Sequence, residues 1–353
     1  MKALVLAGGE GTRLRPITHT SAKQLIPVAN KPILFYGLEA IRDAGIREVG
    51  IVVGPTAEEV RAACGDGSRW GLEITYLPQD APRGLAHAVL IARHYLGDDD
   101  FVMYLGDNLL LEGLTTFVQE FDRHRPNAQI FLARVREPER FGVAVLEGDR
   151  VTKLVEKPKE HISDLALVGV YLFDETVHEA VRRVEPSWRG ELEITDSIQA
   201  LVDAGRTVRA ELITGWWKDT GKLEDMLEAN RMMLSQVEPR VDGEVDGQSR
   251  LVGRVVIERG AKVSRTVIRG PAIVGENSIV EDSLIGPNAS IYYECAIGGS
   301  QVEDSIIMER CRIEDVRPVA QSLLGKDVEV RRGKSGPAAH RLMLGDQSQV
   351  EVF

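Results

Sequence analysis

Three glycines lie close together near the N-terminus, in the run GGEGTRL at residues 8–14. The run follows the apolar stretch 3–7, which we expect to form a buried strand. Closely spaced glycines directly after a strand let the backbone turn tightly, so that successive N–H groups point at one spot and bind an anion. We therefore predict a phosphate-binding loop. Its residues are Gly8, Gly9, Gly11 and Thr12.

The charge around this loop favours a phosphate ligand. Residues 1–31 hold five Lys or Arg side chains and one Glu, whereas the whole chain has a net charge of −11. A local positive excess on an acidic chain is typical of a site for a small polyanion such as a nucleoside triphosphate. A plain glycine turn beside solvated cations is the alternative. Two other phosphate motifs are excluded, because Leu14 replaces the third glycine of the dinucleotide fingerprint and the chain has no G-x-x-x-x-G-K-[ST] run.

Two aspartates stand where strands are expected to end. Asp107 comes just after the apolar stretch 101–105, and Asp219 lies in the run GWWKDTG before a predicted helix. Triphosphate chemistry commonly uses Mg²⁺, which prefers carboxylate, phosphate and water oxygens. We predict that Asp107 and Asp219 hold one Mg²⁺, although each aspartate taken singly also fits a turn or a helix N-cap. The seven histidines form no H-E-x-x-H motif, so a zinc site is not indicated.

The elements that must position these residues alternate along the chain. Up to about residue 107, short apolar or β-branched runs alternate with amphipathic stretches of helical period. This alternation predicts an α/β domain of Rossmann-like architecture, with a mixed but mainly parallel sheet, helices on both faces and ligands beyond the carboxyl ends of the strands. The expected strands are 3–7, 49–53, 72–77 and 101–105, and the expected helices are 33–44, 57–64 and 85–96.

The pattern is less regular between residues 128 and 235, which we interpret as the second half of the same domain. A polar, glycine-rich segment at 242–247 then predicts a linker. We place the first domain at residues 1–240. Its further strands are expected at 129–135, 143–146 and 167–173, and its further helices at 175–184, 194–204 and 223–237.

An internal repeat begins at about residue 250. Aliphatic residues recur at steps of five or six from Ile257 to Ile313, and small residues keep pace from Ala261 to Cys311. A period near six excludes an α-helix and resembles the hexapeptide left-handed β-helix, a triangular solenoid. An antiparallel sandwich, the alternative, would alternate with a period of two over longer runs. We predict a parallel β-helix domain at 250–353. It would continue through 324–328 and 344–348, with a loop at 331–340.

Several short motifs occur in the order found in one enzyme family. Over about residues 1–235 the chain resembles the sugar-phosphate nucleotidylyltransferases, and the repeat resembles the extension of the family's long members. The order and number of the motifs carry this resemblance, since each motif alone is weak. They are LAGGEGTRL at 6–14, KQLIPV at 23–28, KP at 31–32, LGDN at 105–108, FGV at 141–143, EKP at 156–158 and GELEITD at 190–196.

The resemblance implies an enzyme that condenses dTTP with glucose 1-phosphate into dTDP-glucose. The sugar phosphate would attack the α-phosphorus of the nucleotide in line and release pyrophosphate, with Mg²⁺ as the cofactor and no covalent enzyme intermediate. The same chemistry with UTP, or with another nucleotide or sugar 1-phosphate, is the alternative. Two further rivals are an acetyltransferase in the β-helix, which the short solenoid disfavours, and a catalytically inactive regulatory subunit, which the intact Arg13 and Lys23 disfavour.

The resemblance also assigns roles to residues that match the family's motifs. Arg13 and Lys23 are the predicted catalytic residues, because they would neutralise charge on the triphosphate. Besides the glycine loop and Arg13, the predicted nucleotide contacts are Gln24 near the deoxyribose, Gln79 and Gly84 at the base, and Asp107. The predicted sugar-phosphate contacts are Asn108, Gly142, Glu156, Lys157 and Val168.

Composition and charge limit the partners. Both halves of the chain are acidic, which disfavours nucleic acid and membrane surfaces, whose binding needs clustered Lys and Arg. Cys64, Cys295 and Cys311 are widely spaced and predict neither disulfides nor zinc, so we expect a cytoplasmic protein. The longest near-apolar run, 165–173, is too short to cross a bilayer. Because the flat faces of a solenoid need covering, we expect a homo-oligomer.

Overall fold

The computed structural model describes all residues except 149, 334–342, 344–345 and 352–353. The chain divides into two compact units, and each is described by itself. The first unit contains residues 1–10, 22–25 and 34–219. The second contains residues 11–21, 26–33 and 220–353.

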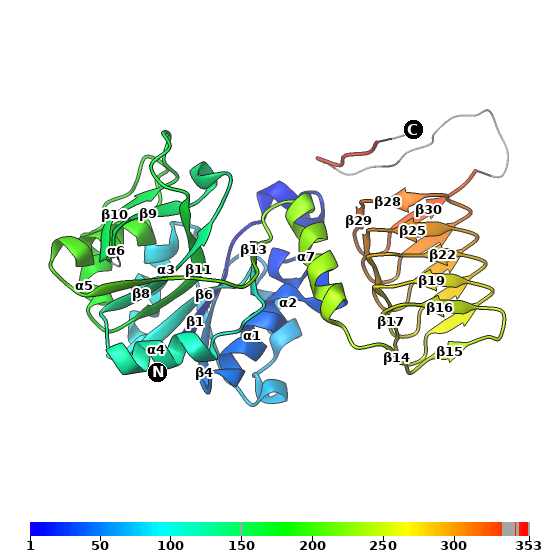
Figure 1. Ribbon diagram of the computed structural model, residues 1–353, viewed down its shortest axis with the longest axis horizontal. Coiled ribbons are helices and arrows are strands. Elements are labelled where there is room, and N and C mark those ends of the chain that lie inside the picture. Colours follow the sequence, from blue (N-terminus) through cyan, green and yellow to red (C-terminus); the bar gives the residue numbers. More distant parts are fainter. Residues whose placement is uncertain (149, 334–342, 344–345, 352–353) are drawn as a thin grey trace. The chain divides into compact units, whose positions relative to one another are not determined.

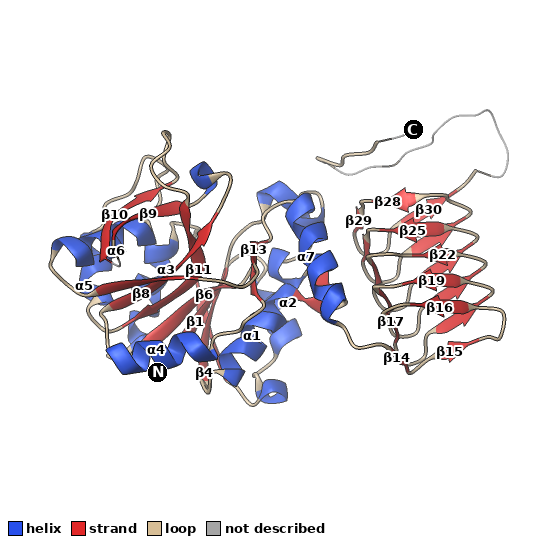
Figure 2. Ribbon diagram, in the orientation of Figure 1, coloured by secondary structure: helices blue, strands red, loops and turns tan. Residues whose placement is uncertain are grey.

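A nine-stranded mixed sheet forms the centre of the first unit (Figures 1 and 2). The four strands at one end are parallel, and β8 and β12 form a further parallel pair. The other neighbouring pairs are antiparallel. In order across the sheet, the strands are β5 (Glu73–Pro78), β4 (Glu48–Val53), β1 (Lys2–Ala7), β6 (Phe101–Leu105), β11 (Leu165–Phe173), β8 (Ala128–Arg134), β12 (Val208–Leu212), β10 (Arg150–Glu156) and β9 (Gly142–Glu147).

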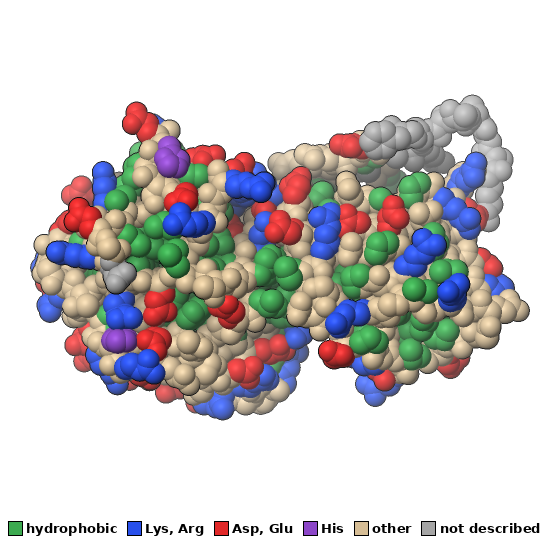
Figure 3. Space-filling model, viewed as in Figure 1, with side chains coloured by type: hydrophobic (Ala, Val, Ile, Leu, Met, Phe, Trp, Pro, Cys, Tyr) green, Lys and Arg blue, Asp and Glu red, His purple; other side chains and the backbone are tan. Residues whose placement is uncertain are grey.

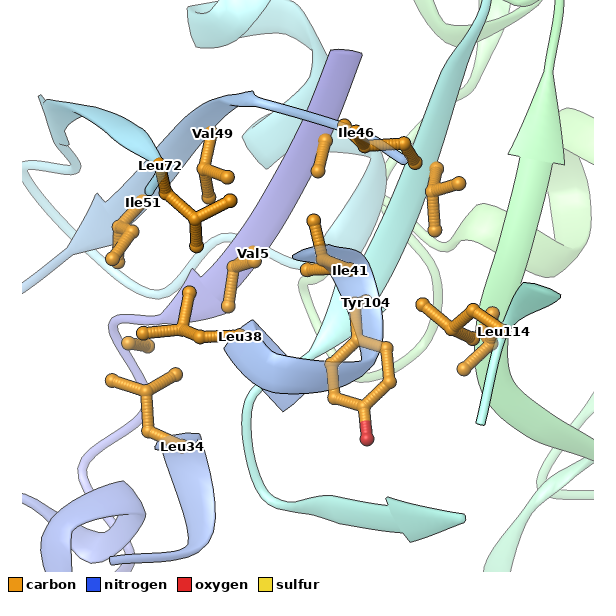
Figure 4. Close-up of a cluster of buried hydrophobic side chains, with 14 of the residues drawn as sticks. Val5, Leu34, Leu38, Ile41, Ile46, Val49, Ile51, Leu72, Tyr104 and Leu114 are labelled. Carbon is orange, nitrogen blue, oxygen red and sulfur yellow. The ribbon is translucent and has the colours of Figure 1, made fainter. Parts of the chain in front are cut away.

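Helices cover both faces of this sheet, as the sequence predicts. One buried cluster joins side chains of α1, α2 and α4 to one face, and another joins α3, α5 and α6 to the other face. Figure 4 shows the first cluster, in which Leu38 of α1 packs towards Val5 of β1. The helices are α1 (Ile33–Asp43), α2 (Ala57–Cys64), α3 (Leu85–Leu96), α4 (Thr115–His124), α5 (Val177–Arg183) and α6 (Ile194–Asp203).

The central strands are apolar because both of their faces are buried. Val5 of β1 belongs to the cluster on one face of the sheet and Leu4 to the cluster on the other. In the same way, Val102 and Met103 of β6 point to opposite clusters. A strand that is covered on both faces has a continuously apolar sequence, which is why these strands were predictable from the sequence.

A small two-stranded sheet lies beside the large one in the first unit. It pairs β7 (Asn108–Leu110) with β13 (Trp217–Asp219) in antiparallel register, so that Asn108 lies opposite Asp219. This pairing was not predictable from the sequence, since each strand has only three residues. The pairing places Asp219 opposite the residue that follows Asp107, and so brings the two candidate metal ligands near each other.

The second unit contains a left-handed parallel β-helix, in which strands of successive coils lie directly above one another (Figure 1). The eleven aliphatic residues of the predicted repeat, from Ile257 to Ile313, all lie in its buried core, and the small residues of the second series are buried as well. Hydroxyl groups link neighbouring coils, since Thr266 Oγ1 accepts a hydrogen bond from Ser283 N and Ser283 Oγ accepts one from Ser300 N.

Three sheets form the faces of the β-helix. The first contains β14 (Arg240–Val241), β17 (Val255–Ile257), β20 (Ala272–Val274), β23 (Ala289–Ile291), β26 (Ile306–Ile307) and β29 (Leu323–Leu324). The second contains β15 (Glu244–Val245), β18 (Lys262–Ser264), β21 (Ile279–Glu281), β24 (Ala296–Gly298), β27 (Arg312–Glu314) and β30 (Glu329–Arg331). The third contains β16 (Arg250–Val252), β19 (Val267–Arg269), β22 (Leu284–Ile285), β25 (Gln301–Glu303) and β28 (Val319–Ala320).

The second unit also includes α7 (Leu223–Gln236) and the hairpin of β2 (Pro27–Val28) and β3 (Lys31–Pro32). Asn230 of α7 is buried and accepts hydrogen bonds from Ala29 N and Ser290 Oγ, so it joins the hairpin to a coil of the β-helix. Residues 344–345 of the predicted repeat at 344–348, and most of the predicted loop at 331–340, lie outside the described residues, whereas residues 346–348 are described and form no strand. The predicted division between residues 240 and 250 stays a prediction.

The surface seen in Figure 3 mixes acidic and basic side chains over both units. Among the described residues, no helix is long and apolar enough to cross a membrane.

Candidate active site

The ammonium group of Lys23 lies between two carboxylates of the first unit. Its Nζ is 2.5 Å from Asp107 Oδ2 and 3.9 Å from Asp219 Oδ1. The Lys23 side chain is only 7% exposed. The structure therefore brings together three residues that the sequence analysis placed at the triphosphate and the metal.

The surroundings of Asp107 keep its carboxyl group ionised. Burial by itself would raise the pKa of Asp107, but the Lys23 ammonium and the hydrogen bonds from Lys23 and Asn108 hold this pKa below its usual value. Asn108 Nδ2 donates to Asp107 Oδ1 at 2.9 Å, and Trp217 Nε1 donates to Asn108 Oδ1 at 2.6 Å. The contacts of β7 with β13 thus orient Asp107 as well as Asp219.

This pair of carboxylates fits a divalent cation. Both reach the single Nζ atom of Lys23, so both face a point where positive charge is stabilised. Carboxylate oxygens are ligands that Mg²⁺ prefers, and one or two of them commonly suffice when phosphate and water complete the shell. Among the described residues no group of three or more His, Cys, Asp or Glu side chains forms a metal cluster.

The predicted nucleotide residues of the first unit meet at the carboxyl ends of β1, β5 and β6. A Cβ atom at Gly8 would lie 3.0 Å from Gln79 Oε1, and one at Gly9 would lie 3.9 Å from Gln24 Nε2. Within the described structure, Gln24 Oε1 is buried without a hydrogen-bond partner. A buried amide oxygen without a partner is costly, which points to a ligand or a bound water at this place.

Gly84 lies at the start of α3 and has a φ of +101°. A Cβ atom there would lie 2.3 Å from the carbonyl oxygen of Leu192, so only glycine fits between α3 and this neighbouring segment. Gln79 Nε2 lies 3.0 Å from His87 Nδ1 of the same helix. His87 could not be identified from the sequence, because a lone histidine on a helix carries no signal.

The predicted sugar-phosphate residues form a charged cluster at the end of β10. Glu156 Oε1 lies 3.7 Å from Lys157 Nζ and 3.5 Å from Arg189 Nη1. A Cβ atom at Gly142 would lie 2.9 Å from Glu156 Oε2, so the glycine leaves room for this carboxylate. Burial, followed by the charge of Glu193, raises the pKa of Glu156, although Lys157 and Arg189 act in the opposite direction.

Asn108 and Val168 lie near each other on neighbouring elements. Both are buried, and a Cβ atom at Gly169, the residue after Val168, would lie 2.7 Å from the Asn108 side-chain amide. Asn108 thus contacts β11 on one side and Asp107 on the other. The structure thus places Asn108 against β11, at the residue next to Val168.

The remaining predicted residues belong to the second unit. Gly11 has a φ of +60° and precedes a single turn of 3-10 helix, Thr12–Leu14. Thr18 Oγ1 donates to the carbonyl oxygen of Gly11 at 2.8 Å, which fixes the loop. Arg13 is exposed, and its guanidinium lies about 3 Å from the place where a Cβ atom of Gly221 would be.

A family model described as Nucleotidyl transferase matches residues 2–236. The chain belongs to this family. Its match covers the whole of the large sheet and α7, and it ends shortly before the β-helix begins.

Two relatives of this nucleotidyl transferase match it over its full length. It is 56% identical to the glucose-1-phosphate thymidylyltransferases of Streptomyces griseus and Streptomyces antibioticus, with 100% of this chain and 99% of each relative covered. A solved structure of a putative glucose-1-phosphate thymidylyltransferase from Bacillus anthracis, in complex with a sucrose, is 35% identical with a TM-score of 0.62. This match covers 66% of the present nucleotidyl transferase and 94% of that chain.

Two residues not named from the sequence contact the candidate site residues of this nucleotidyl transferase. Arg189 contacts Glu156, Glu191 and Glu193, and Trp217 holds Asn108. Arg189 directly precedes the GELEITD motif, so its place beside a motif was an available signal. For Trp217 the signal was weaker, because aromatic residues are common in buried cores.

Proposed function

We propose that this chain is a glucose-1-phosphate thymidylyltransferase, which forms dTDP-glucose and pyrophosphate from dTTP and glucose 1-phosphate. The observation that carries the proposal is the 56% identity to two such enzymes over the full length of the chain. The geometry supports it, since Lys23, Asp107 and Asp219 meet in one group and Glu156, Lys157 and Arg189 meet in another.

On the nucleotide side, the chain would supply positioning and positive charge. The backbone around Gly8 and Gly9 would face the phosphates, with Gln24 near the deoxyribose and Gln79 and Gly84 at the base. Arg13 would bind the triphosphate and stabilise the charge that builds up on the leaving pyrophosphate. Fixed donors of this kind typically contribute about 10²- to 10³-fold in rate.

Asp107 and Asp219 would hold Mg²⁺, which neutralises phosphate charge when it is bound. The Lys23 ammonium would then find its counter-charge partly in the triphosphate instead of in the two aspartates. Two carboxylates of the chain itself hold Lys23, which helps to fix the position of its ammonium group.

On the sugar side, Glu156 would accept hydrogen bonds from the sugar hydroxyls, and Lys157 would neutralise the attacking phosphate. Asn108, Gly142 and Val168 would border the sugar. The phosphate oxygen attacks the α-phosphorus as the bond to pyrophosphate breaks, so no side chain has to act as a nucleophile. Catalysis then depends on orientation and charge.

A pyrophosphate-release assay tests this function. We expect turnover with glucose 1-phosphate and dTTP that requires Mg²⁺, and slower turnover when UTP, GTP or CTP replaces dTTP. Equal or faster turnover with UTP would assign the same chemistry to a different nucleotide. Arg13→Ala should reduce the rate by about 10²- to 10³-fold, whereas a merely regulatory subunit would show no turnover to lose.

We further propose that the protein is a cytoplasmic homo-oligomer. All three cysteines are buried and unpaired, as suits a reducing compartment. The flat outer faces of the β-helix offer surfaces for assembly. Light scattering at micromolar concentration should give a mass above that of one chain, and a monomer mass would contradict this proposal.

A further inference from the structure

A tight turn between α5 and α6 presents two large side chains at its centre. Gly190 N donates to the carbonyl oxygen of Ser187 at 2.8 Å, and Ser187 N donates to that of Glu191 at 2.8 Å. Gly190 has a φ of +76°, which suits the end of such a turn. Trp188 and Arg189 therefore occupy the two central positions.

The two side chains differ sharply in exposure. Arg189 is 22% exposed and contacts Glu156, Glu191 and Glu193. Trp188 is 72% exposed. Exposing an indole leaves a large apolar surface in water, and tryptophan is enriched where such a surface meets a ligand or a partner.

Trp188 contacts a second segment that begins in the sugar-phosphate group. Lys159 follows Lys157 by two residues, and its Nζ lies 5.4 Å from the centroid of the Trp188 ring. The two segments thus meet twice, at Glu156 with Arg189 and further out at Lys159 with Trp188. The outer contact lies at the rim of the group that would bind the sugar phosphate.

The charges of this group show why the rim needs a cation. Three carboxylates, those of Glu156, Glu191 and Glu193, surround the single guanidinium of Arg189. Lys157 reduces the negative excess but does not remove it, and Lys159 adds a further positive charge beside this group. A sugar phosphate carries negative charge, so Lys159 removes a repulsion that would otherwise oppose its entry.

We propose that Trp188 and Lys159 form an outer rim of the sugar-phosphate site, where the indole ring packs against the C–H face of the pyranose and Lys159 attracts the phosphate. This inference rests on the proposed function, because it takes a sugar 1-phosphate as the ligand. Trp188 and Lys159 would contribute to the choice and affinity of the sugar phosphate, without contacting the nucleotide.

Steady-state kinetics with each substrate varied in turn test this role. Trp188→Ala should raise the KM for glucose 1-phosphate by about 3- to 10-fold, the size expected for one aromatic contact. The KM for dTTP and kcat should stay within about twofold. Trp188→Phe should restore most of the affinity, because a ring is retained. Lys159→Ala should raise the same KM, with an effect that shrinks at high salt, and Lys159→Arg should restore it.

Ile162→Ala is a matched control, since Ile162 is 37% exposed on the same connection between β10 and β11 and should leave both KM values unchanged. Unchanged sugar-phosphate KM in an active Trp188→Ala variant would overturn the inference. A lower oligomer mass with unchanged KM would also overturn it, and would make Trp188 an assembly contact.

The inference and the proposed function can fail separately. If the unaltered protein releases no pyrophosphate with any pair of substrates, the proposed function fails. Calorimetry with glucose 1-phosphate alone then decides the inference, which requires weaker binding by Trp188→Ala than by the unaltered chain. Equal binding, or no binding by either protein, would overturn it.

Discussion

The Lys23 ammonium lies 2.5 Å from Asp107 Oδ2, in a contact that joins a single turn of 3-10 helix, Lys23–Leu25, to the segment just after the central strand β6. Asp219 reaches the same ammonium from β13. A lysine held between two carboxylates is a cation placed where the proposed reaction needs one, and its removal leaves two carboxylates facing each other.

Asp107 and Asp219 can be tested by changes that preserve their shape. We expect Asp107→Asn and Asp219→Asn each to reduce kcat by about 10²- to 10³-fold, since each removes one fixed charge from the phosphate site. Pyrophosphate release over a Mg²⁺ titration measures the effect. Asp282→Asn is the control, because Asp282 forms an exposed pair with Arg265 on the β-helix. Near-normal kcat in both active-site variants would show that the two carboxylates do not serve the reaction.

Glu156 makes the use of sugar phosphate sensitive to acid. Its pKa is raised by burial and by Glu193, so the carboxylate takes up a proton at a higher pH than an ordinary glutamate does. Below that pH the carboxyl group is uncharged and one of its oxygens donates a hydrogen bond instead of only accepting, so kcat/KM for glucose 1-phosphate should fall. The dependence of kcat/KM on pH measures this. Glu156→Gln should lower kcat/KM at pH 7 and remove this acid limb, whereas the exposed neighbour change Glu160→Gln should keep the limb in place.

His178 should make the folded state sensitive to acid. Burial, followed by the charge of Arg93, lowers the pKa of His178 to about 4, whereas the unfolded chain takes up this proton near pH 6.5. Stability from this group is therefore complete above pH 6.5 and is lost as the pH falls towards 4, by up to about 1.4 kcal/mol per pH unit.

Urea unfolding at pH 7 and pH 5 measures this effect. From pH 7 to pH 5, the free energy of unfolding of His178→Leu should fall by about 2 kcal/mol less than that of the unaltered protein. His94→Leu, a change at an exposed histidine of α3, should behave like the unaltered protein. Equal losses in the protein and in His178→Leu would show that His178 is not the acid-sensitive group.

Truncation of an inward-facing side chain of the β-helix should lower its stability more than truncation of an outward-facing one. Ile285 is fully buried inside the solenoid, and Ile285→Ala should cost about 2 to 5 kcal/mol through lost burial and a new cavity. Ile279 is 44% exposed on an outer face, and Ile279→Ala should cost less than about 0.5 kcal/mol. Thermal unfolding compares the two variants. A similar loss of stability in both variants would contradict the assignment of Ile285 to the core and of Ile279 to the outer face.

Much of the fold could be predicted because one pattern covers many residues. Val5 and Val102 belong to strands that are apolar on both faces, and Ile257 to Ile313 repeat with the period of a solenoid. In both cases burial favours apolar residues at many positions, so the same pattern occurs many times in the sequence and predicts the element.

The pairing of β7 with β13 could not be predicted, although it brings Asp219 opposite Asn108. Two strands of three residues carry too little periodicity, and their partners are far apart in the chain. The same holds for the contact of Arg189 with Glu156, which lies 33 residues earlier in the chain, although the place of Arg189 beside the GELEITD motif was a signal. Long-range pairs between short segments depend on tertiary packing, which a local pattern does not contain.

The most direct test of the proposed chemistry is phosphorus NMR of the unaltered protein with dTTP, glucose 1-phosphate and Mg²⁺. The account predicts that the signals of dTDP-glucose and pyrophosphate appear together in equal amounts, and that neither appears when glucose 1-phosphate is left out. Pyrophosphate formed without the sugar phosphate, or no new signal with both substrates present, would contradict it.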